Sequence, residues 1–200
     1  QLTSVDGVTY TWDQRGNLVH DGVFTYTYNA AGRLVQAESV TTTVAYTYNL
    51  AGLRVTQSVS DVTTAFVWDW ASIVPEMLDD GTTVYLLGRD TVGYDDGAWS
   101  YVLADALGSV RQVVDGSGTV VDTREWSPYG TEVGTAQGGL GYTGEWWDDG
   151  LGMQYLRARW YEPSLGVFTR RDEWEGDIEA PYSLQDYAYV LANPVGYRRP

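Results

Sequence analysis

The stretch that decides the fold runs from Gly152 to Asp172 and reads GMQYLRARWYEPSLGVFTRRD. Aromatic and branched apolar side chains recur in near-alternation along it, and alternation with a period of two is typical of a β-strand. The unit Glu162-Pro163-Ser164 interrupts this pattern, because proline lacks the N–H that a strand ladder needs. The stretch is therefore predicted to form a β-hairpin, with Tyr155–Tyr161 as one strand and Leu165–Phe168 as the other.

The wording of this stretch resembles the signature of the core domain of the Rhs/YD-repeat family. That signature typically reads G-L-x-Y-L-R-A-R-Y-Y-D-P-x-L-G-R-F-x-x-x-D-P, and here it stands as GLGMQYLRARWYEPSLGVFTRRDE from Gly150 onward. The chain departs from it at Trp160, Glu162, Val167 and Glu173, and Glu173 replaces the proline that follows the signature's aspartate. The resemblance implies an all-β fold in which antiparallel hairpin repeats form a spiralling sheet around a hollow shell.

The composition agrees with a protein of many short strands. Aromatic residues make up 14% of the 200 residues, and 23 glycines supply turns. The net charge of −15 disfavours nucleic acid and anionic membranes as partners, and no apolar stretch is long enough for a membrane-spanning helix. The chain has no cysteine, and its acidic turns lack the ligand spacing of an EF-hand, so neither a metal nor another cofactor is expected.

The first third of the chain is repetitive. The unit Tyr-Thr-aromatic-[Asp/Asn]-x-x-Gly-x-x-Val occurs three times, anchored at Asp13, Asn29 and Asn49, and weaker copies lie at Asp69 and Asp105. Asp or Asn at the start of a turn accepts backbone N–H groups, and glycine three residues later adopts a positive φ. Each repeat is therefore predicted to be a hairpin whose aromatic side chains stack on those of the next repeat, because a single hairpin is only marginally stable.

The chain divides into two regions on this pattern. Residues 1–75 carry the YD-type repeats, and residues 76–200 form a core-like region that we expect to continue the same sheet. The clearest further strands are predicted at Thr82–Leu87, Ser100–Ala104, Ser109–Val114 and Thr119–Glu125. A short helix is predicted at Ser183–Leu191, with Ser183 as its N-cap and Asn193-Pro194 after its end.

The family resemblance also implies chemistry near the signature. The family's core domain is a self-cleaving aspartyl protease that releases a C-terminal polypeptide, often a toxin, inside the shell. Two carboxylates are needed because a close pair shares one proton, so that one acts as base and the other as acid. The first maps onto Asp172, but Arg199 stands where the second would fall, so self-cleavage is expected to be impaired. Asp177 and Asp186 remain possible substitutes.

Arginines near this aspartate have two interpretations. Arg170 and Arg171 could support catalysis by orienting the scissile segment or tuning Asp172, or they could pair with neighbouring carboxylates. Arg157 and Arg159 are better explained by ion pairing in the shell wall. Tryptophans form a third candidate set, because exposed rings can stack on sugars, although in such a sheet they more often pack between repeats; they are Trp146, Trp147, Trp160 and Trp174.

Three functions compete on these grounds. The first is encapsulation: the chain closes one end of a chamber that holds or presents a C-terminal cargo polypeptide, with upstream repeats or other copies of the chain completing the wall. The second is an extracellular adhesion or carbohydrate-binding module, and the third is an active autoprotease. The expected location is the outside or surface of a bacterial or archaeal cell, and the sequence shows no secretion signal of its own.

Overall fold

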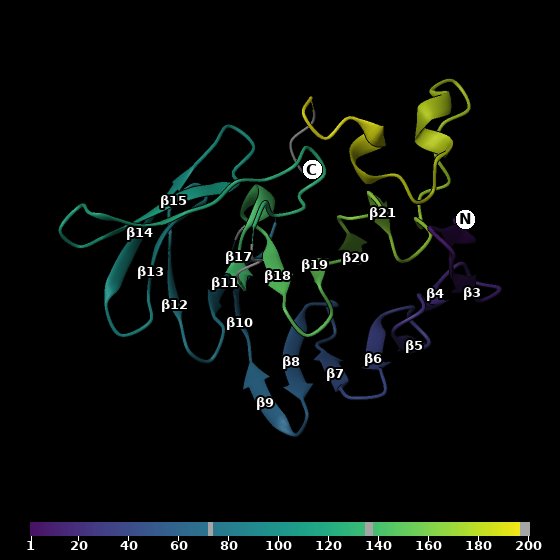
Figure 1. Ribbon diagram of the computed structural model, residues 1–200, viewed down its shortest axis with the longest axis horizontal. Coiled ribbons are helices and arrows are strands. Elements are labelled where there is room, and N and C mark those ends of the chain that lie inside the picture. The colour runs from purple at the N-terminus through teal and green to yellow at the C-terminus, as the bar shows by residue number, and fades with distance from the viewer. Residues whose placement is uncertain (72–73, 135–137, 197–200) are drawn as a thin grey trace.

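Strands and turns make up nearly all of the computed structural model, which describes residues 1–71, 74–134 and 138–196. The all-β prediction is confirmed: every strand pair is antiparallel, and within each sheet every strand pairs with the next one along the chain (Figure 1). The only helices in these residues are short 3-10 turns. None of them is long and apolar enough to cross a membrane.

The repeats form the first large sheet, which has seven strands in sequence order, and a two-stranded hairpin of β1 (Ser4–Val5) and β2 (Val8–Thr9) precedes it. The seven strands are β3 (Thr11–Trp12), β4 (Leu18–His20), β5 (Thr25–Tyr28), β6 (Leu34–Glu38), β7 (Thr43–Tyr48), β8 (Arg54–Val59) and β9 (Val62–Ala65).

The repeat turns have one structure, as the sequence predicts. In the turns that begin at Asp13, Asn29, Asn49 and Asp105, the side-chain oxygen accepts the N–H four residues further on, at 2.8 to 3.1 Å. In each turn the glycine three residues after this Asp or Asn donates its N–H to the backbone carbonyl of the Asp or Asn. The glycine has a positive φ in all four turns. The turns therefore encode the strand ends locally, without help from the rest of the molecule.

The second sheet continues the first. Phe66, between β9 and β10, donates its N–H to the Val55 carbonyl at 2.9 Å, so one bent strand path leads from one sheet into the other. The sheet contains β10 (Val67–Asp69), β11 (Glu76–Asp79), β12 (Val84–Leu87), β13 (Thr91–Asp95), β14 (Trp99–Ala104), β15 (Val110–Asp115) and β16 (Val120–Thr123). The four strands predicted in this region correspond to β12, β14, β15 and β16.

The signature lies in the third sheet, which runs back across the first (Figure 1). Its strands are β17 (Gly139–Leu140), β18 (Trp146–Asp148), β19 (Met153–Leu156), β20 (Arg159–Glu162) and β21 (Val167–Phe168), and η1 (Tyr142–Gly144) follows β17. The prediction of one strand over Tyr155–Tyr161 is wrong. A turn at Arg157 and Ala158 divides it into β19 and β20, which pair from Leu156 and Arg159 onward.

Backbone hydrogen bonds join the third sheet to both of the others. Val110 of β15 donates to the Gly141 carbonyl at 3.0 Å. At the other end, Leu18 donates to the Thr169 carbonyl at 2.8 Å and Arg171 donates to the Gly16 carbonyl at 3.1 Å. We call the contacts between residues 16–18 and 169–171 the closing junction. Through it the strands form a continuous wall that returns to its own beginning.

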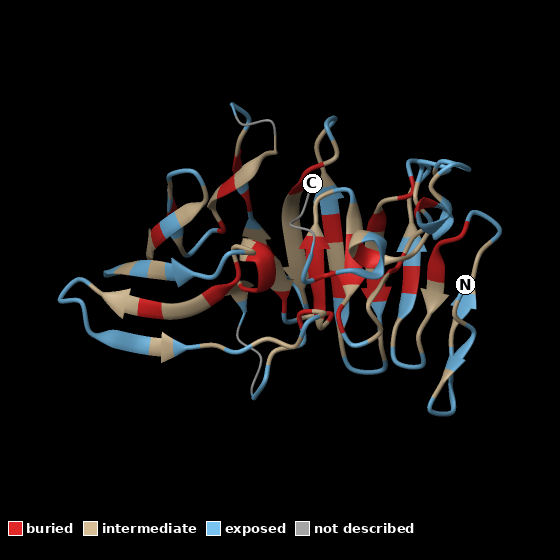
Figure 2. Ribbon diagram, turned by 90° about the horizontal axis from the view of Figure 1, so that it is seen from above, coloured by how far each residue is buried: buried red, intermediate tan, exposed pale blue. Residues whose placement is uncertain are grey.

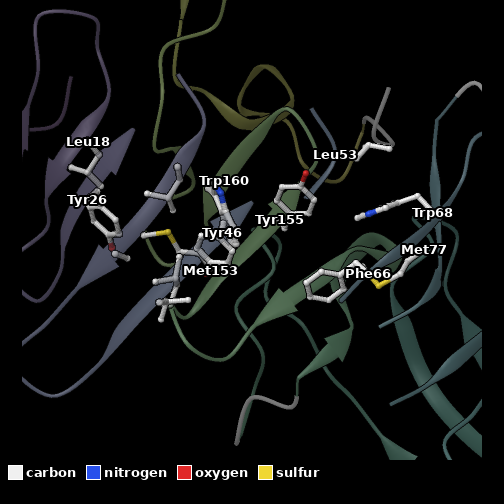
Figure 3. Packing of buried hydrophobic residues seen from close by; sticks show 14 of the residues in the cluster. Leu18, Tyr26, Tyr46, Leu53, Phe66, Trp68, Met77, Met153, Tyr155 and Trp160 are labelled. Atoms are coloured by element: carbon white, nitrogen blue, oxygen red, sulfur yellow. The ribbon is translucent and has the colours of Figure 1, made fainter. Parts of the chain in front are cut away.

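The main core lies between the first and third sheets, in the middle of the molecule (Figure 2). Aromatic side chains of the repeats meet those of the signature strands there: the ring centres of Tyr46 and Trp160 are 4.9 Å apart, and those of Trp68 and Tyr155 are 6.1 Å apart (Figure 3). This corrects the expected stacking of each repeat on the next. The repeat face is buried by a second layer of sheet instead, which covers more apolar area than an edge contact can.

The predicted helix at Ser183–Leu191 is replaced by two 3-10 turns, η2 (Pro181–Leu184) and η3 (Tyr189–Ala192). Ser183 does not act as an N-cap, because its Oγ accepts the Asp177 N–H and donates to the Ala180 carbonyl. Between the two turns the backbone is held beside β21, where Phe168 donates its N–H to the Tyr187 carbonyl at 2.9 Å. Pairing with the sheet therefore overrides the local helical preference.

Candidate functional site

The candidate site is built on the turn between β19 and β20 and on the segment after β21. Arg157 has a positive φ of 57°, a conformation that costs a residue with a Cβ about 1–2 kcal/mol. Its guanidinium offsets that strain: Nη1 lies 2.7 and 2.6 Å from the two carboxylate oxygens of Glu145, and Nε donates to the Pro75 carbonyl. Glu76 is a second acidic neighbour, at 3.6 Å.

Asp172 follows β21 and is held in place by three contacts. Its Oδ2 lies 2.7 Å from Nη2 of Arg159, its Oδ1 accepts the Trp174 N–H at 3.0 Å, and its own N–H donates to the Asp186 carbonyl. Burial lowers the pKa of Arg159, and the neighbouring Asp172 opposes that shift. The carboxylate therefore belongs to an ion pair at the end of a strand.

Arg170 and Arg171, the two supporting candidates, point to different acids. Arg170 pairs with Glu173, and Arg171 Nε lies 2.8 Å from Oδ2 of Asp186. The carboxylate of Asp186 is thus engaged by Arg171, although its backbone lies beside Asp172. Arg199 is outside the described residues, as is everything after Gly196.

A hollow of about 430 Å³ lies at one rim of the sheet, and we call it the rim hollow. Its lining includes the four arginines of the site and two of their acidic neighbours, Arg157, Arg159, Arg170, Arg171, Asp172 and Glu173. The repeat turns at residues 31–33 and 51–53 form one side, and the signature turn with residues 170–173 forms the other. Arg33 and Trp70 also line it, and neither was predicted as a site residue. The sequence feature that could have pointed to Arg33 is its position directly after the glycine of a repeat turn.

The chemistry of the site is that of paired charges. A two-carboxylate mechanism requires a second acid that shares a proton with Asp172. In the described residues the Asp172 carboxylate is paired with Arg159 and the Asp186 carboxylate with Arg171, so each of the two acids contacts an arginine. The catalytic role of Asp172 and the supporting roles of Arg170 and Arg171 remain proposals.

A second charged site, which sequence reasoning missed, is completely buried. Arg54 Nη1 lies 2.8 Å from Oδ2 of Asp148, 94 residues further along the chain, and both side chains are inaccessible to solvent. Tyr46 and Gln57 also donate to Asp148. Burial and the Asp148 charge raise the pKa of Tyr46. The signal was present in the repeats, because Arg54 occupies the position that buried leucines hold in the two copies before it.

Aromatic rings surround the Arg54 guanidinium. Its carbon lies 4.2 Å from the ring centre of Phe66, 4.7 Å from Tyr155 and 5.5 Å from Trp160. Cation–π attraction compensates for the Nε and Nη2 atoms, which have no hydrogen-bond partner within the part of the chain that is described. The pair thus ties the repeat sheet to the signature sheet.

The candidate tryptophans divide by burial. Trp160 is in the core, and Trp146 packs against the core. Trp174 is 58% exposed, whereas Trp147 is partly buried. A different pair, Trp99 and Tyr101 on β14, is exposed on one face of the second sheet.

Comparisons with known proteins agree with this architecture. The chain is 28% identical over 211 residues to the tRNA3(Ser)-specific nuclease WapA of Bacillus spizizenii, covering 98% of this chain and 9% of the nuclease. It is 25% identical over 168 residues to the double-stranded DNA deaminase toxin A of Burkholderia cenocepacia, covering 68% of this chain and 11% of that toxin. The chain therefore spans about a tenth of the length of these relatives.

Solved structures share the fold. The chain superposes on the Photorhabdus luminescens Tc holotoxin pore with a TM-score of 0.70 at 17% identity, over 94% of this chain and 10% of the other. For the TcdB2–TccC3 complex with Cdc42 the TM-score is 0.67 at 19% identity, over 96% and 12%. Residues 1–195 match the model of the Teneurin YD-shell family. The repeat turns, the signature strands and this match together show that the chain belongs to the Teneurin YD-shell family.

Proposed function

We propose that this chain is the C-terminal part of a YD-repeat β-shell that closes a hollow chamber around a C-terminal cargo polypeptide of the toxin type. The observation that carries the proposal is the closing junction, because it turns a strand meander into a wall that meets itself. β3 is the end strand of the first sheet, so upstream repeats can extend the wall at that edge.

The relatives support the toxin association. WapA is named as a tRNA nuclease and the Burkholderia protein as a DNA deaminase toxin, and both are far longer than this chain. Upstream repeats of the same protein, or other copies of the chain, would complete the chamber, because 200 residues cannot enclose a protein. Such a protein would act outside the cell or at its surface, as a secreted component.

Protease protection of the full-length protein tests encapsulation. We expect any polypeptide after Pro200 to resist digestion while the wall is intact. It should become sensitive in the Arg54→Ala variant, because an unpaired buried Asp148 weakens the wall. Arg89 is an exposed arginine in the turn between β12 and β13, and Arg89→Ala is the matched control that should leave protection unchanged. Rapid digestion of the cargo in the wild type, while the wall itself stays intact, would contradict encapsulation.

Self-cleavage forms a separate part of the proposal. We expect the chain to remain uncut, because Arg199 replaces the second aspartate of the family pattern. Intact mass and a C-terminal peptide map of the full-length product measure this directly. If a cut is found, Asp172→Asn should abolish it. If Arg199→Asp produces a cut in a chain that is otherwise uncut, position 199 is where the second carboxylate must stand for Asp172 to act.

A second candidate is an adhesion or carbohydrate-binding module. Trp99 and Tyr101 favour it, because both lie exposed on alternate positions of β14, where rings could stack on sugars. Binding of the full-length protein to a glycan array, lost in Trp99→Ala, would support this function over a purely structural wall.

A further inference from the structure

Arg33 differs from the other arginines of the rim hollow in its partners. Four of the five form ion pairs: Arg157 with Glu145, Arg159 with Asp172, Arg170 with Glu173 and Arg171 with Asp186. Arg33 has no ion pair among residues 1–71, 74–134 and 138–196. It is thus the one guanidinium at this hollow, in that part of the chain, whose charge is left without a carboxylate.

The guanidinium of Arg33 nevertheless lies against the neighbouring repeat. It crosses the neighbouring repeat turn at Gly52, where a Cβ would lie only 2.5 Å from its Nη2 atom. Its carbon lies 6.0 Å from the ring centre of Tyr48. Glycine at position 52 therefore has two roles: it allows the positive φ of the turn, and it leaves room for the arginine.

The hollow also has an apolar side. Trp70 is 58% exposed and lines it together with Leu53 and Pro75. An exposed tryptophan that lines the same hollow as this guanidinium adds a packing surface to a charge-assisted hydrogen-bond donor. Such a combination matches an acidic side chain followed by an apolar one.

We propose that the rim hollow binds an acidic peptide segment, with an Asp or Glu carboxylate on Arg33 and a neighbouring apolar side chain on Trp70. Carboxylate is the matching group, because the other four arginines of the hollow already hold carboxylates in this wall. A long polyanion fits poorly, because it would extend over a chain with a net charge of −15. A short segment reaches only the hollow. The proposal stands on this geometry and does not depend on the proposed function.

Fluorescence anisotropy of a labelled peptide tests the proposal on the full-length protein. The probes are Gly-Leu-Glu-Leu-Gly and the same peptide with Gln in place of Glu, both with capped ends. We expect the Glu peptide to bind about tenfold more tightly than the Gln peptide, because one charge-assisted hydrogen bond distinguishes them. The preference should shrink as salt is raised from 0.05 to about 0.5 M.

Matched variants locate the binding. Arg33→Gln should remove the preference for Glu, whereas Arg89→Gln, which deletes the same charge at an exposed position outside the hollow, should retain it. Trp70→Ala should weaken both peptides by a similar factor. Equal effects of Arg33→Gln and Arg89→Gln would overturn the proposal, as would a wild type that does not distinguish the two peptides. Displacement of the Glu peptide by an equal concentration of inorganic phosphate would also overturn it, by showing a general anion site.

Discussion

The strands of the signature and those of the second sheet have the same local structure, but they differ in what covers them. On β19 and β20, Tyr155 is 1% exposed and Trp160 is 4% exposed, because the repeat sheet lies against them. On β14, Trp99 is 43% exposed and Tyr101 is 42% exposed. Similar aromatic strands thus form a core in one region and a surface in the other. Pairing determines the strands, whereas burial determines where the stability lies.

The largest expected change in stability comes from breaking the buried ion pair between Arg54 and Asp148, which joins the repeat sheet to the covered signature sheet. Arg54→Ala should lower the free energy of unfolding by about 3–5 kcal/mol, because it leaves Asp148 buried without its cation. Urea unfolding measures this change. The double variant Arg54→Met, Asp148→Leu should recover part of the loss, because it removes the unpaired buried charge but leaves the Tyr46 and Gln57 donors without their acceptor. A cost below about 1 kcal/mol for Arg54→Ala would show that the pair does not join the two sheets.

Two tryptophan truncations compare the regions directly. Trp160→Ala should cost about 3–5 kcal/mol of unfolding free energy, because it empties space in the core. Trp99→Ala should cost about 1 kcal/mol or less, because solvent already reaches the ring. Thermal or urea unfolding of both variants gives the difference. Equal costs would mean that another part of the protein buries the β14 face.

Two turn glycines extend the comparison to a covered and an open turn, one in the first sheet and one in the second. Gly52 and Gly118 have φ values of 89° and 84°, so alanine at either position carries a backbone cost of about 1–2 kcal/mol. A Cβ at Gly118 meets nothing within 4 Å, whereas at Gly52 it meets the Arg33 guanidinium. Gly52→Ala should therefore exceed Gly118→Ala by about 1 kcal/mol in equilibrium unfolding. Equal costs for the two variants would show that Arg33 moves aside freely.

The smallest effects concern pH and have opposite signs in the two regions. Burial raises the pKa of Glu162, so the folded state retains this proton longer and loses stability as the pH rises from about 4 toward neutral. Hydrogen bonds from Ser117 and Thr119 lower the pKa of Asp115, so its contribution is present above the unfolded pKa of 3.8 and is lost as the pH falls below that value.

Each carboxylate can be neutralised to test these signs. Glu162→Gln should flatten the decrease in stability that accompanies a rise in pH from about 4 toward neutral. Asp115→Asn should flatten the loss of stability that accompanies a fall in pH below 3.8. Urea unfolding between pH 3 and 7 measures both slopes. If the two variants change the slope in the same direction, the assignment of opposite environments is wrong.

Local features of the fold could be predicted from the sequence, and distant contacts could not. The turns at Asp13, Asn29 and Asn49 follow from residues within five positions, so their structure was readable. The division of Tyr155–Tyr161 into two strands was hidden, because a two-residue turn without glycine leaves the alternation almost intact. The division of the chain at residue 75 remains a prediction.

The candidate site was predictable only in part. The family resemblance pointed to Asp172, and charge alone pointed to the arginines around it. Their individual partners were not readable, because the pairing of Arg159 with Asp172 or Arg171 with Asp186 depends on how the third sheet sits on the first. Arg33 escaped notice because its repeat is far from the signature in sequence, and only folding brings the two together.

The closing junction has a consequence for synthesis. Leu18 leaves the ribosome well before Thr169, its hydrogen-bond partner. At 5–20 residues per second the delay is about 8–30 s. During that interval the repeat strands can pair with each other, but the layer that buries Tyr26 and Tyr46 has not yet been made. The nascent chain therefore displays an apolar sheet for many seconds, long enough for chaperones to bind it before the wall is complete.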